Sequence, residues 1–182
     1  MSGLRCLLFW LLLLMPGALL AVPTFQPAMM PLGKGPDAVA ASTARMVGAM
    51  LEYSRWPSAR PAVRLCIAGA ARHADRLADI RLSSGAGVEL VAIGAPGEPA
   101  PDRCDALYIG RLDSPTLGRL IAGARGEAVV TIAEDDPACR SGAMFCLLYT
   151  PQSLSFQLSI DAVSRSAVRI DPRVLRLSKG GY

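Results

Sequence analysis

The chain has 182 residues, of which 52% are hydrophobic and 19% charged. That length suits one ordinary domain, and so much apolar material excludes a wholly disordered chain. Lys and Arg together number 19 against 15 acidic residues, and the resulting net charge of +4 is scattered along the chain. This excludes the clustered basic footprint of a nucleic-acid-binding protein. The single histidine, His73, argues against common catalytic and zinc constellations.

Residues 1–21 have the pattern of a secretory signal peptide. Arg5 supplies a short basic region, and Cys6–Met15 is an unbroken apolar run that is too short to span a membrane comfortably. Pro16 and Gly17 then break the helix, and Ala21 offers a small residue at the cleavage point. The sequence therefore predicts an exported chain, with an uncleaved membrane anchor as the alternative.

Helices and strands alternate through the next hundred residues. Residues 22–36, rich in proline and glycine, are predicted to form a flexible leader. Asp37 is expected to cap a helix that runs to about Arg55 and is stopped by Trp56-Pro57. Further elements are predicted as strands at 63–69, 88–93, 105–109 and 128–132, helices at 70–82 and 114–124, and a Pro/Gly-rich loop at 94–101. This alternation favours a parallel sheet with helices on both faces.

The last third of the chain departs from that rhythm. Residues 143–149 and 154–159 are predicted to form a hairpin around 150–153, followed by helical turns to Ser178 and a tail at 179–182. Leu154, Phe156 and Leu158 alternate along the second strand and are expected in the core. The fold prediction is one α/β domain with a mixed, mostly parallel sheet, helices on both faces, and a C-terminal hairpin plus helix.

Four cysteines remain once the predicted signal peptide is removed: Cys66, Cys104, Cys139 and Cys146. An even number in an oxidising compartment indicates two disulfides. Four cysteines allow three pairings, and spacing favours Cys139 with Cys146, which leaves Cys66 with Cys104. Buried thiols are the alternative. Zinc is not expected, because the chain has no Cys-x-x-Cys and one histidine.

Motifs that could carry catalysis or nucleotide binding are incomplete. Gly69-Ala-Ala-Arg72 follows a strand but lacks the Gly-x-Gly-x-x-Gly spacing, so a tight connection is favoured over a dinucleotide site. Glu134-Asp135-Asp136 could hold a cation or act as acid and base, but a solvated loop is favoured. His73 is expected at the surface. No catalytic residue, metal or cofactor is predicted.

Four arginines recur at spacings of three to four near the C-terminus: Arg165, Arg169, Arg173 and Arg176. If this segment is helical, they share one face. A solvated face is one interpretation of that pattern. The more specific interpretation is that the four arginines form a docking surface for an acidic partner or ligand.

Seven segments, taken together and in order, resemble the YfiR family of periplasmic proteins over roughly residues 38–177. They are Leu51-Glu-Tyr-Ser-Arg-Trp-Pro57, Arg64-Leu-Cys-Ile-Ala-Gly69, Cys104-Asp-Ala-Leu-Tyr-Ile-Gly110, Thr131-Ile-Ala-Glu-Asp-Asp-Pro-Ala-Cys139, Gly142-Ala-Met-Phe-Cys146, Ser155-Phe-Gln-Leu-Ser-Ile-Asp-Ala-Val163 and Val168-Arg-Ile-Asp-Pro-Arg-Val-Leu-Arg-Leu177.

The resemblance implies a regulator rather than an enzyme. Family members repress an inner-membrane diguanylate cyclase, YfiN, by engaging its periplasmic sensor domain, and an outer-membrane lipoprotein, YfiB, relieves the repression. The output is cyclic-di-GMP, and through it exopolysaccharide and biofilm. The resemblance also implies an α/β sandwich-like fold, a periplasmic location, a homodimer, and the disulfides Cys66–Cys104 and Cys139–Cys146. The second bridge is the one we link to redox sensing, because its loop is short and lies near the hairpin.

Partner contacts are placed on the C-terminal segment, at Arg165, Arg169 and Asp171. Two departures from the family pattern bear on this placement. Gln157 and Ser159 replace a glutamate and an asparagine, and Asp171 stands where close relatives have a histidine. A family ligand pocket built on that histidine is therefore in doubt here. A periplasmic small-molecule-binding module and a secreted hydrolase using His73, Asp135 or Asp136 remain the alternative functions.

Overall fold

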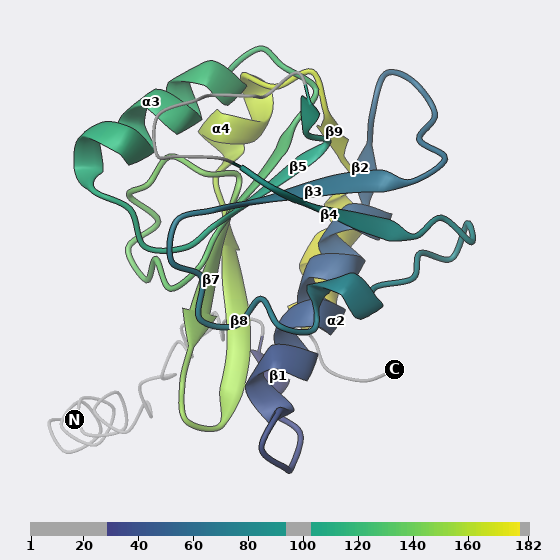
Figure 1. The fold of residues 1–182 in the computed structure, drawn as a ribbon, viewed down its shortest axis with the longest axis vertical. Helices are drawn as coiled ribbons and strands as arrows, with labels where there is room; N and C mark the ends of the chain where they lie inside the picture. Colours follow the sequence, from purple (N-terminus) through teal and green to yellow (C-terminus); the bar gives the residue numbers. More distant parts are fainter. Residues whose placement is uncertain (1–28, 94–102, 179–182) are drawn as a thin grey trace, which may run out of the picture.

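The computed structural model describes residues 29–93 and 103–178. Four predicted segments lie outside the described residues. They are the signal peptide, residues 22–28 of the leader, the 94–101 loop and the 179–182 tail. Figure 1 shows the described chain as one twisted sheet with helices packed against it. This confirms the predicted α/β fold class.

Seven strands form the main sheet, and its centre is parallel (Figure 1). From edge to edge the order is β1 (Met29–Pro31), β8 (Ser153–Leu158), β7 (Phe145–Tyr149), β6 (Val130–Ala133), β5 (Ala106–Ile109), β3 (Val63–Ala68) and β4 (Val88–Ala92). The strands from β7 to β4 run parallel, whereas β8 pairs antiparallel with β7 and with β1. The predicted hairpin is the β7–β8 pair, joined around Thr150 as expected.

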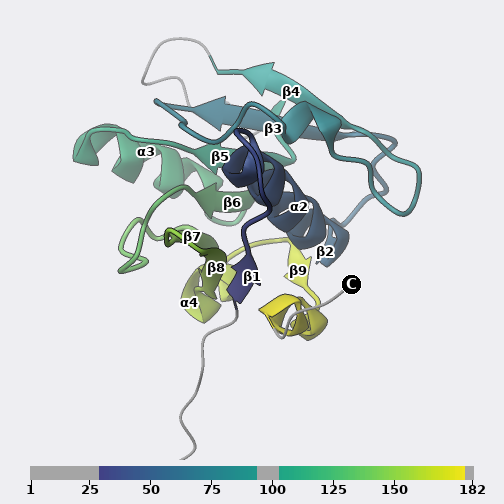
Figure 2. The same cartoon turned by 90° about the horizontal axis from the view of Figure 1, so that it is seen from below.

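Two helices cover opposite faces of this sheet (Figure 2). Successive side chains along a strand point to opposite faces, so one strand contributes side chains to the hydrophobic cores on both faces of the sheet. On β5, Tyr108 packs on the side of α2 (Ala38–Glu52), while Leu107 and Ile109 pack on the side of α3 (Ser114–Ala124). The Asp113 side chain caps α3 by accepting a hydrogen bond from the N–H of Thr116 at 2.9 Å.

The segment predicted as a helix at 70–82 is mostly irregular, and this prediction was wrong. Only a short 3₁₀ turn, η2 (Leu77–Asp79), forms there. The N–H groups of Arg72 and His73 donate to the side chain of Glu134, and the preceding Ala70 is held in a β-bridge with Arg111. Contacts with distant residues fix the backbone at the start of this segment, and tertiary context overrides the local helix propensity. Leu77 is nevertheless fully buried and packs in the core on the α2 side.

Three boundaries also differ from the sequence prediction. Met29–Pro31, placed in the flexible leader, forms the edge strand β1 against β8. The first helix ends at Glu52 and is followed by β2 (Ser54–Arg55). The expected C-terminal helix is broken into α4 (Ile160–Ser164), β9 (Arg169–Ile170) and η4 (Pro172–Ser178), and β9 pairs antiparallel with β2.

Two glycines close the crevice between β3 and β5, where the strand order reverses. In open α/β sheets ligands bind at this switch point, outside the carboxyl ends of the strands. Here Gly69 and Gly110 bring two backbone segments together, and Ala70 forms a bridge with Arg111. A Cβ atom at Gly110 would lie 2.4 Å from the backbone nitrogen of Ala71. The described chain therefore fills the place where a ligand of this architecture would sit.

Gly110→Ala is expected to lower the free energy of unfolding by about 2 kcal/mol, because the added methyl group overlaps backbone atoms that cannot turn aside. Gly118→Ala is the matched control. Gly118 lies inside α3 with open space around it, so alanine should raise the free energy of unfolding by about 0.5–1 kcal/mol. Urea denaturation measures both variants, and equal effects would contradict the close-packed switch point.

Candidate functional site

Two disulfides join the four cysteines of the described chain. Cys66 in β3 is bonded to Cys104, two residues before β5, and Cys139 is bonded to Cys146 in β7. These are the two pairs favoured by spacing and implied by the resemblance. The first bridge spans 38 residues and the second only 7, so the second closes the small loop between β6 and β7.

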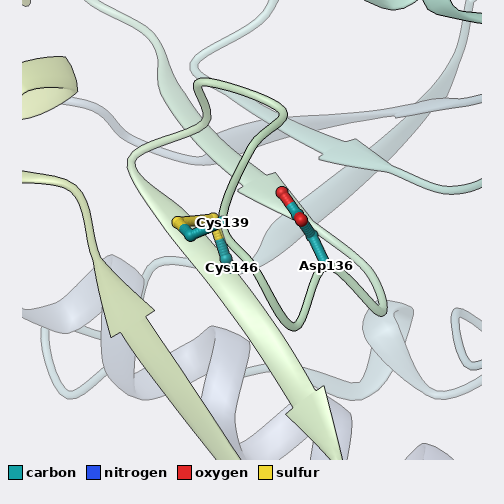
Figure 3. A group of neighbouring side chains, drawn as sticks. All are labelled: Asp136, Cys139 and Cys146. Carbon is teal, nitrogen blue, oxygen red and sulfur yellow. A yellow bond between two sulfur atoms is a disulfide. The ribbon is translucent and has the colours of Figure 1, made fainter.

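Asp136 lies beside the second disulfide, just before the loop that this disulfide closes. Figure 3 shows the carboxylate of Asp136 next to the bonded pair Cys139–Cys146. One ligand atom from each of the three residues lies within 4.8 Å of the others. While the two sulfurs are bonded to each other they are not thiolates, which are the form that binds metals. The group therefore offers a cation one carboxylate and no thiolate in the oxidised protein.

The carboxylate of Asp136 already has donors of its own. It accepts hydrogen bonds from the backbone N–H groups of Arg140 at 3.1 Å and Ser141 at 2.8 Å. Partial burial acts to raise the pKa of Asp136, but the hydrogen bonds outweigh it and hold this pKa below its usual value. Asp136 thus holds the first residues of the disulfide loop, Arg140 and Ser141, through their backbone N–H groups.

Glu134 is buried, so the prediction of a solvated acidic loop was wrong for this residue. Only 9% of its surface is exposed. Its carboxylate accepts the N–H of Arg72 at 2.8 Å, the N–H of His73 at 2.7 Å and the hydroxyl of Tyr108 at 2.9 Å. The turn that resembled part of a phosphate-binding motif is therefore held by an anion of the chain itself. Asp135 is exposed and pairs with Arg72 at the surface.

A chain of hydroxyl groups connects Glu134 to helix α2. The hydroxyl of Tyr149 lies 3.3 Å from that of Tyr108 and 3.1 Å from the hydroxyl oxygen of Thr43. Burial raises the pKa of Tyr149 to about 12 and shifts the pKa of Tyr108 upwards as well. Both phenols stay protonated at neutral pH and act as donors. His73 is half buried, with its ring centroid 4.6 Å from that of Tyr149.

The three residues assigned to partner binding lie on different elements. Arg165 ends α4, where its guanidinium donates to Asp161 at 2.6 Å. Arg169 lies in β9 opposite Arg55 of β2. Asp171 follows β9 and accepts hydrogen bonds from the guanidinium of Arg173. The expectation of one arginine face on one helix was wrong, because the chain between Arg165 and Arg173 leaves the helix to pair with β2.

The β2–β9 pair carries a small charged surface around Tyr53. The N–H of Asp171 donates to the carbonyl oxygen of Tyr53 at 2.8 Å. The guanidinium carbon of Arg173 lies 5.9 Å from the centre of the Tyr53 ring, within the range of a cation–π contact. Arg55 and Arg169 are exposed nearby. Arg173 pairs with Asp171, and Arg55 also acts on this carboxylate electrostatically, so the exposed Arg169 leaves this corner able to receive an acidic group.

Asp171 is expected to titrate near pH 2. The side chain of Arg173 donates to this carboxylate and holds the pKa of Asp171 at about 2. Because this pKa is lower in the folded state, the stabilising pair is fully present above about pH 4, the value of an unfolded Asp, and is lost as pH falls through 2. NMR titration of the carboxyl carbon measures this, and Arg173→Ala should raise the pKa of Asp171 part of the way toward its usual value, because the backbone N–H of residue 173 still donates to the carboxylate. An unchanged pKa in Arg173→Ala would contradict the pairing.

A family model described as YfiR/HmsC-like matches residues 40–179. This range takes in the main sheet apart from β1, both disulfides and the β2–β9 corner. The chain belongs to the YfiR/HmsC-like family. The predicted resemblance is therefore confirmed at the level of the family, whose members are periplasmic, non-catalytic regulators of diguanylate cyclases.

Solved structures that resemble this YfiR/HmsC-like chain do so only distantly. An alanine–glyoxylate aminotransferase from Nostoc sp. matches with a TM-score of 0.43 and 13% identity, covering 78% of this chain and 42% of that one. A ureidoglycine–glyoxylate aminotransferase from Bacillus subtilis matches with a TM-score of 0.40 and 12% identity, covering 83% and 41%. The chain spans about two fifths of the length of either enzyme.

No helix within residues 29–93 and 103–178 of this YfiR/HmsC-like protein has the length and apolar character of a membrane span.

Sequence reasoning missed Tyr108 and Tyr149, and it misjudged Glu134. The sequence did contain a sign that Glu134 is buried. This residue directly follows the buried strand β6, so its backbone is still within the protein interior. Nothing in the sequence pattern pointed to the two tyrosines as partners of that carboxylate.

Proposed function

We propose that this protein is a periplasmic repressor that binds the periplasmic sensor domain of a YfiN-like inner-membrane diguanylate cyclase and lowers cyclic-di-GMP. The observation that carries the proposal is the family match over residues 40–179. Residues 1–21 act as the signal peptide in this proposal, and residues 37–178 form the regulatory domain, which works as a homodimer. Biofilm and exopolysaccharide are the downstream output.

Contacts with the cyclase are assigned to Arg165, Arg169 and Asp171. Arg165 and Arg169 are exposed, and Arg169 lies opposite a second exposed arginine, Arg55. Arginine is favoured at protein interfaces because its planar fork binds a carboxylate through two hydrogen bonds. The charged corner around Tyr53 supports this assignment, although Asp171 contributes through its hold on Arg173 rather than through a free carboxylate.

Release of the cyclase is assigned to two routes. A YfiB-like outer-membrane lipoprotein sequesters the repressor, and reducing or misfolding stress disables it through the Cys139–Cys146 bridge. The loop closed by this bridge packs on β6 through the hydrogen bond from the N–H of Met144 to the hydroxyl of Thr131 at 2.9 Å. A Cys139→Ser variant that kept full stability and full repression would rule out the redox route.

The decisive experiment measures cellular cyclic-di-GMP after deletion of the gene and after its restoration. Deletion is expected to raise cyclic-di-GMP and biofilm, and restoration is expected to reverse both. An Arg165→Ala, Arg169→Ala double variant should fail to restore, whereas Arg119→Ala, an exposed arginine on α3, should restore fully. Unchanged cyclic-di-GMP on deletion, with an active cyclase present, would overturn the proposal.

A further inference from the structure

An open groove lies between α3 and α4, beside the loop closed by Cys139–Cys146. Its volume is about 400 Å³, including the space open to solvent. Its almost fully buried floor is apolar at Ile121, Ala124 and Met144, together with Thr131, whose hydroxyl oxygen accepts the N–H of Met144. Most of that volume is open solvent, and the space below the rim is about 40 Å³, so the groove admits only a small group.

Two arginines stand on the rim of this groove, Arg125 at the end of α3 and Arg165 at the end of α4. Their backbones are linked, since the N–H of Gly126 donates to the carbonyl oxygen of Arg165 at 2.8 Å. Arg165 is paired with Asp161, but both side chains are more than half exposed, so this pair contributes little and can be exchanged. Within the described ranges, no carboxylate lies at ion-pair distance from Arg125. The rim thus carries two cations and one acid.

The wall opposite α4 is fixed before any ligand arrives. Gly142 lies inside the disulfide loop with a φ of +82°, a conformation that other residues rarely adopt. A Cβ atom at Gly142 would come within 3.3 Å of Cγ2 of Ile121, so the loop backbone itself closes that side of the groove. The disulfide and the hydrogen bond from Met144 to Thr131 hold the loop in place. A prearranged wall reduces the ordering cost of binding.

We propose that this groove binds a carboxylate carried on a short aliphatic stem, with Arg125 and Arg165 as its cations. The guanidinium groups supply paired N–H donors that match the two oxygens of a carboxylate. The apolar floor receives the stem, because burying its methylene groups removes apolar surface from water. An entering carboxylate replaces Asp161 as the partner of Arg165.

Two sources present this chemical group, a free short-chain carboxylate and the side chain of a glutamate on a partner protein. The site goes beyond the proposed function, because binding of the free carboxylate requires no cyclase. It also adds Arg125, a residue that neither the sequence pattern nor the family assignment singled out.

The first experiment adds propionate to the purified, oxidised protein and follows the backbone amide signals by NMR. Propionate is expected to shift the amides of Gly126 and Gly142 in a saturable manner, and uncharged propionamide is the matched control. The Arg125→Ala, Arg165→Ala double variant should bind propionate about tenfold or more weakly, whereas Arg119→Ala should bind like the native protein. Absence of saturable shifts, or equal shifts with propionamide, would overturn the proposal.

The second experiment identifies the source by testing Arg125→Ala in the cellular cyclic-di-GMP assay. Loss of repression, together with competition between propionate and the purified periplasmic domain of the cyclase, assigns the groove to a glutamate side chain of the partner. Full repression assigns it to a free carboxylate. Failure of the proposed function would leave cyclic-di-GMP unaffected by gene deletion but would not alter propionate binding, so the two failures are distinguishable.

Discussion

Replacing Cys66 and Cys104 together by alanine is expected to lower the free energy of unfolding by about 4 kcal/mol. The bridge spans 38 residues, and losing it frees a long loop in the unfolded chain. Because domains of this size are stable by only about 5–15 kcal/mol, the variant should sit close to the unfolding threshold at 37 °C. Urea denaturation of purified native and variant protein measures the loss.

The Cys139, Cys146 double alanine variant provides the comparison, since the same argument for a separation of 7 gives about 2.5 kcal/mol. The difference arises from the unfolded state, so the folded structures of both variants should be nearly native. Near the first bridge, buried Asp105 still pairs with Arg60 at 2.9 Å and with Arg64 at 3.2 Å. A larger loss for the short loop than for the long one would show that native contacts, rather than chain entropy, dominate.

Glu134→Ala is expected to lower the free energy of unfolding by about 3 kcal/mol. The substitution leaves two backbone N–H groups, those of Arg72 and His73, and the hydroxyl of Tyr108 without their acceptor. Each unsatisfied buried donor costs about 1–3 kcal/mol, and entry of water offsets part of that total. Thermal and urea denaturation at neutral pH measure the effect.

Two variants make the Glu134 prediction specific. Glu134→Gln keeps one acceptor oxygen but turns an NH₂ group toward a donor, so its loss should be intermediate. Asp135→Asn changes the exposed neighbour, whose φ of 54° asparagine tolerates, and should alter the free energy of unfolding by less than about 0.5 kcal/mol. If Glu134→Ala costs no more than Asp135→Asn, the buried carboxylate does not hold the turn.

Elements with a clear local signal were predicted well. The strand at 63–69 and the helix at 114–124 have apolar periodicity together with a glycine end or an aspartate cap, and the structure places both within a residue of the prediction. Prediction failed where distant residues decide the local structure. Residues 70–82 have helix-forming residues, but the start of the segment is held by Arg111 and Glu134, which lie far along the chain.

In the candidate site, too, features with a local sequence signal were predictable and features that depend on distant residues were not. The four cysteines could be found in the sequence and their pairing favoured from spacing, because only cysteine residues form disulfides. The separation of Arg165 from Arg169 could not be foreseen, since it depends on the pairing of β9 with β2, two strands of two residues each. Arg125 was overlooked for a related reason: only the packing of α3 beside α4 places it next to Arg165.

The short strand β1 makes the first described residues dependent on the last third of the chain. Met29 pairs with Ser155, and the hydroxyl of Ser153 contacts the sulfur of Met29 across 124 positions. A chain that emerges from a ribosome or a translocation channel N-terminus first must therefore wait for β8 before this edge of the sheet can close. Such non-local pairing slows folding and leaves an unpaired strand edge in the meantime. The N-terminal edge of the sheet is therefore among the last parts of the fold that can form.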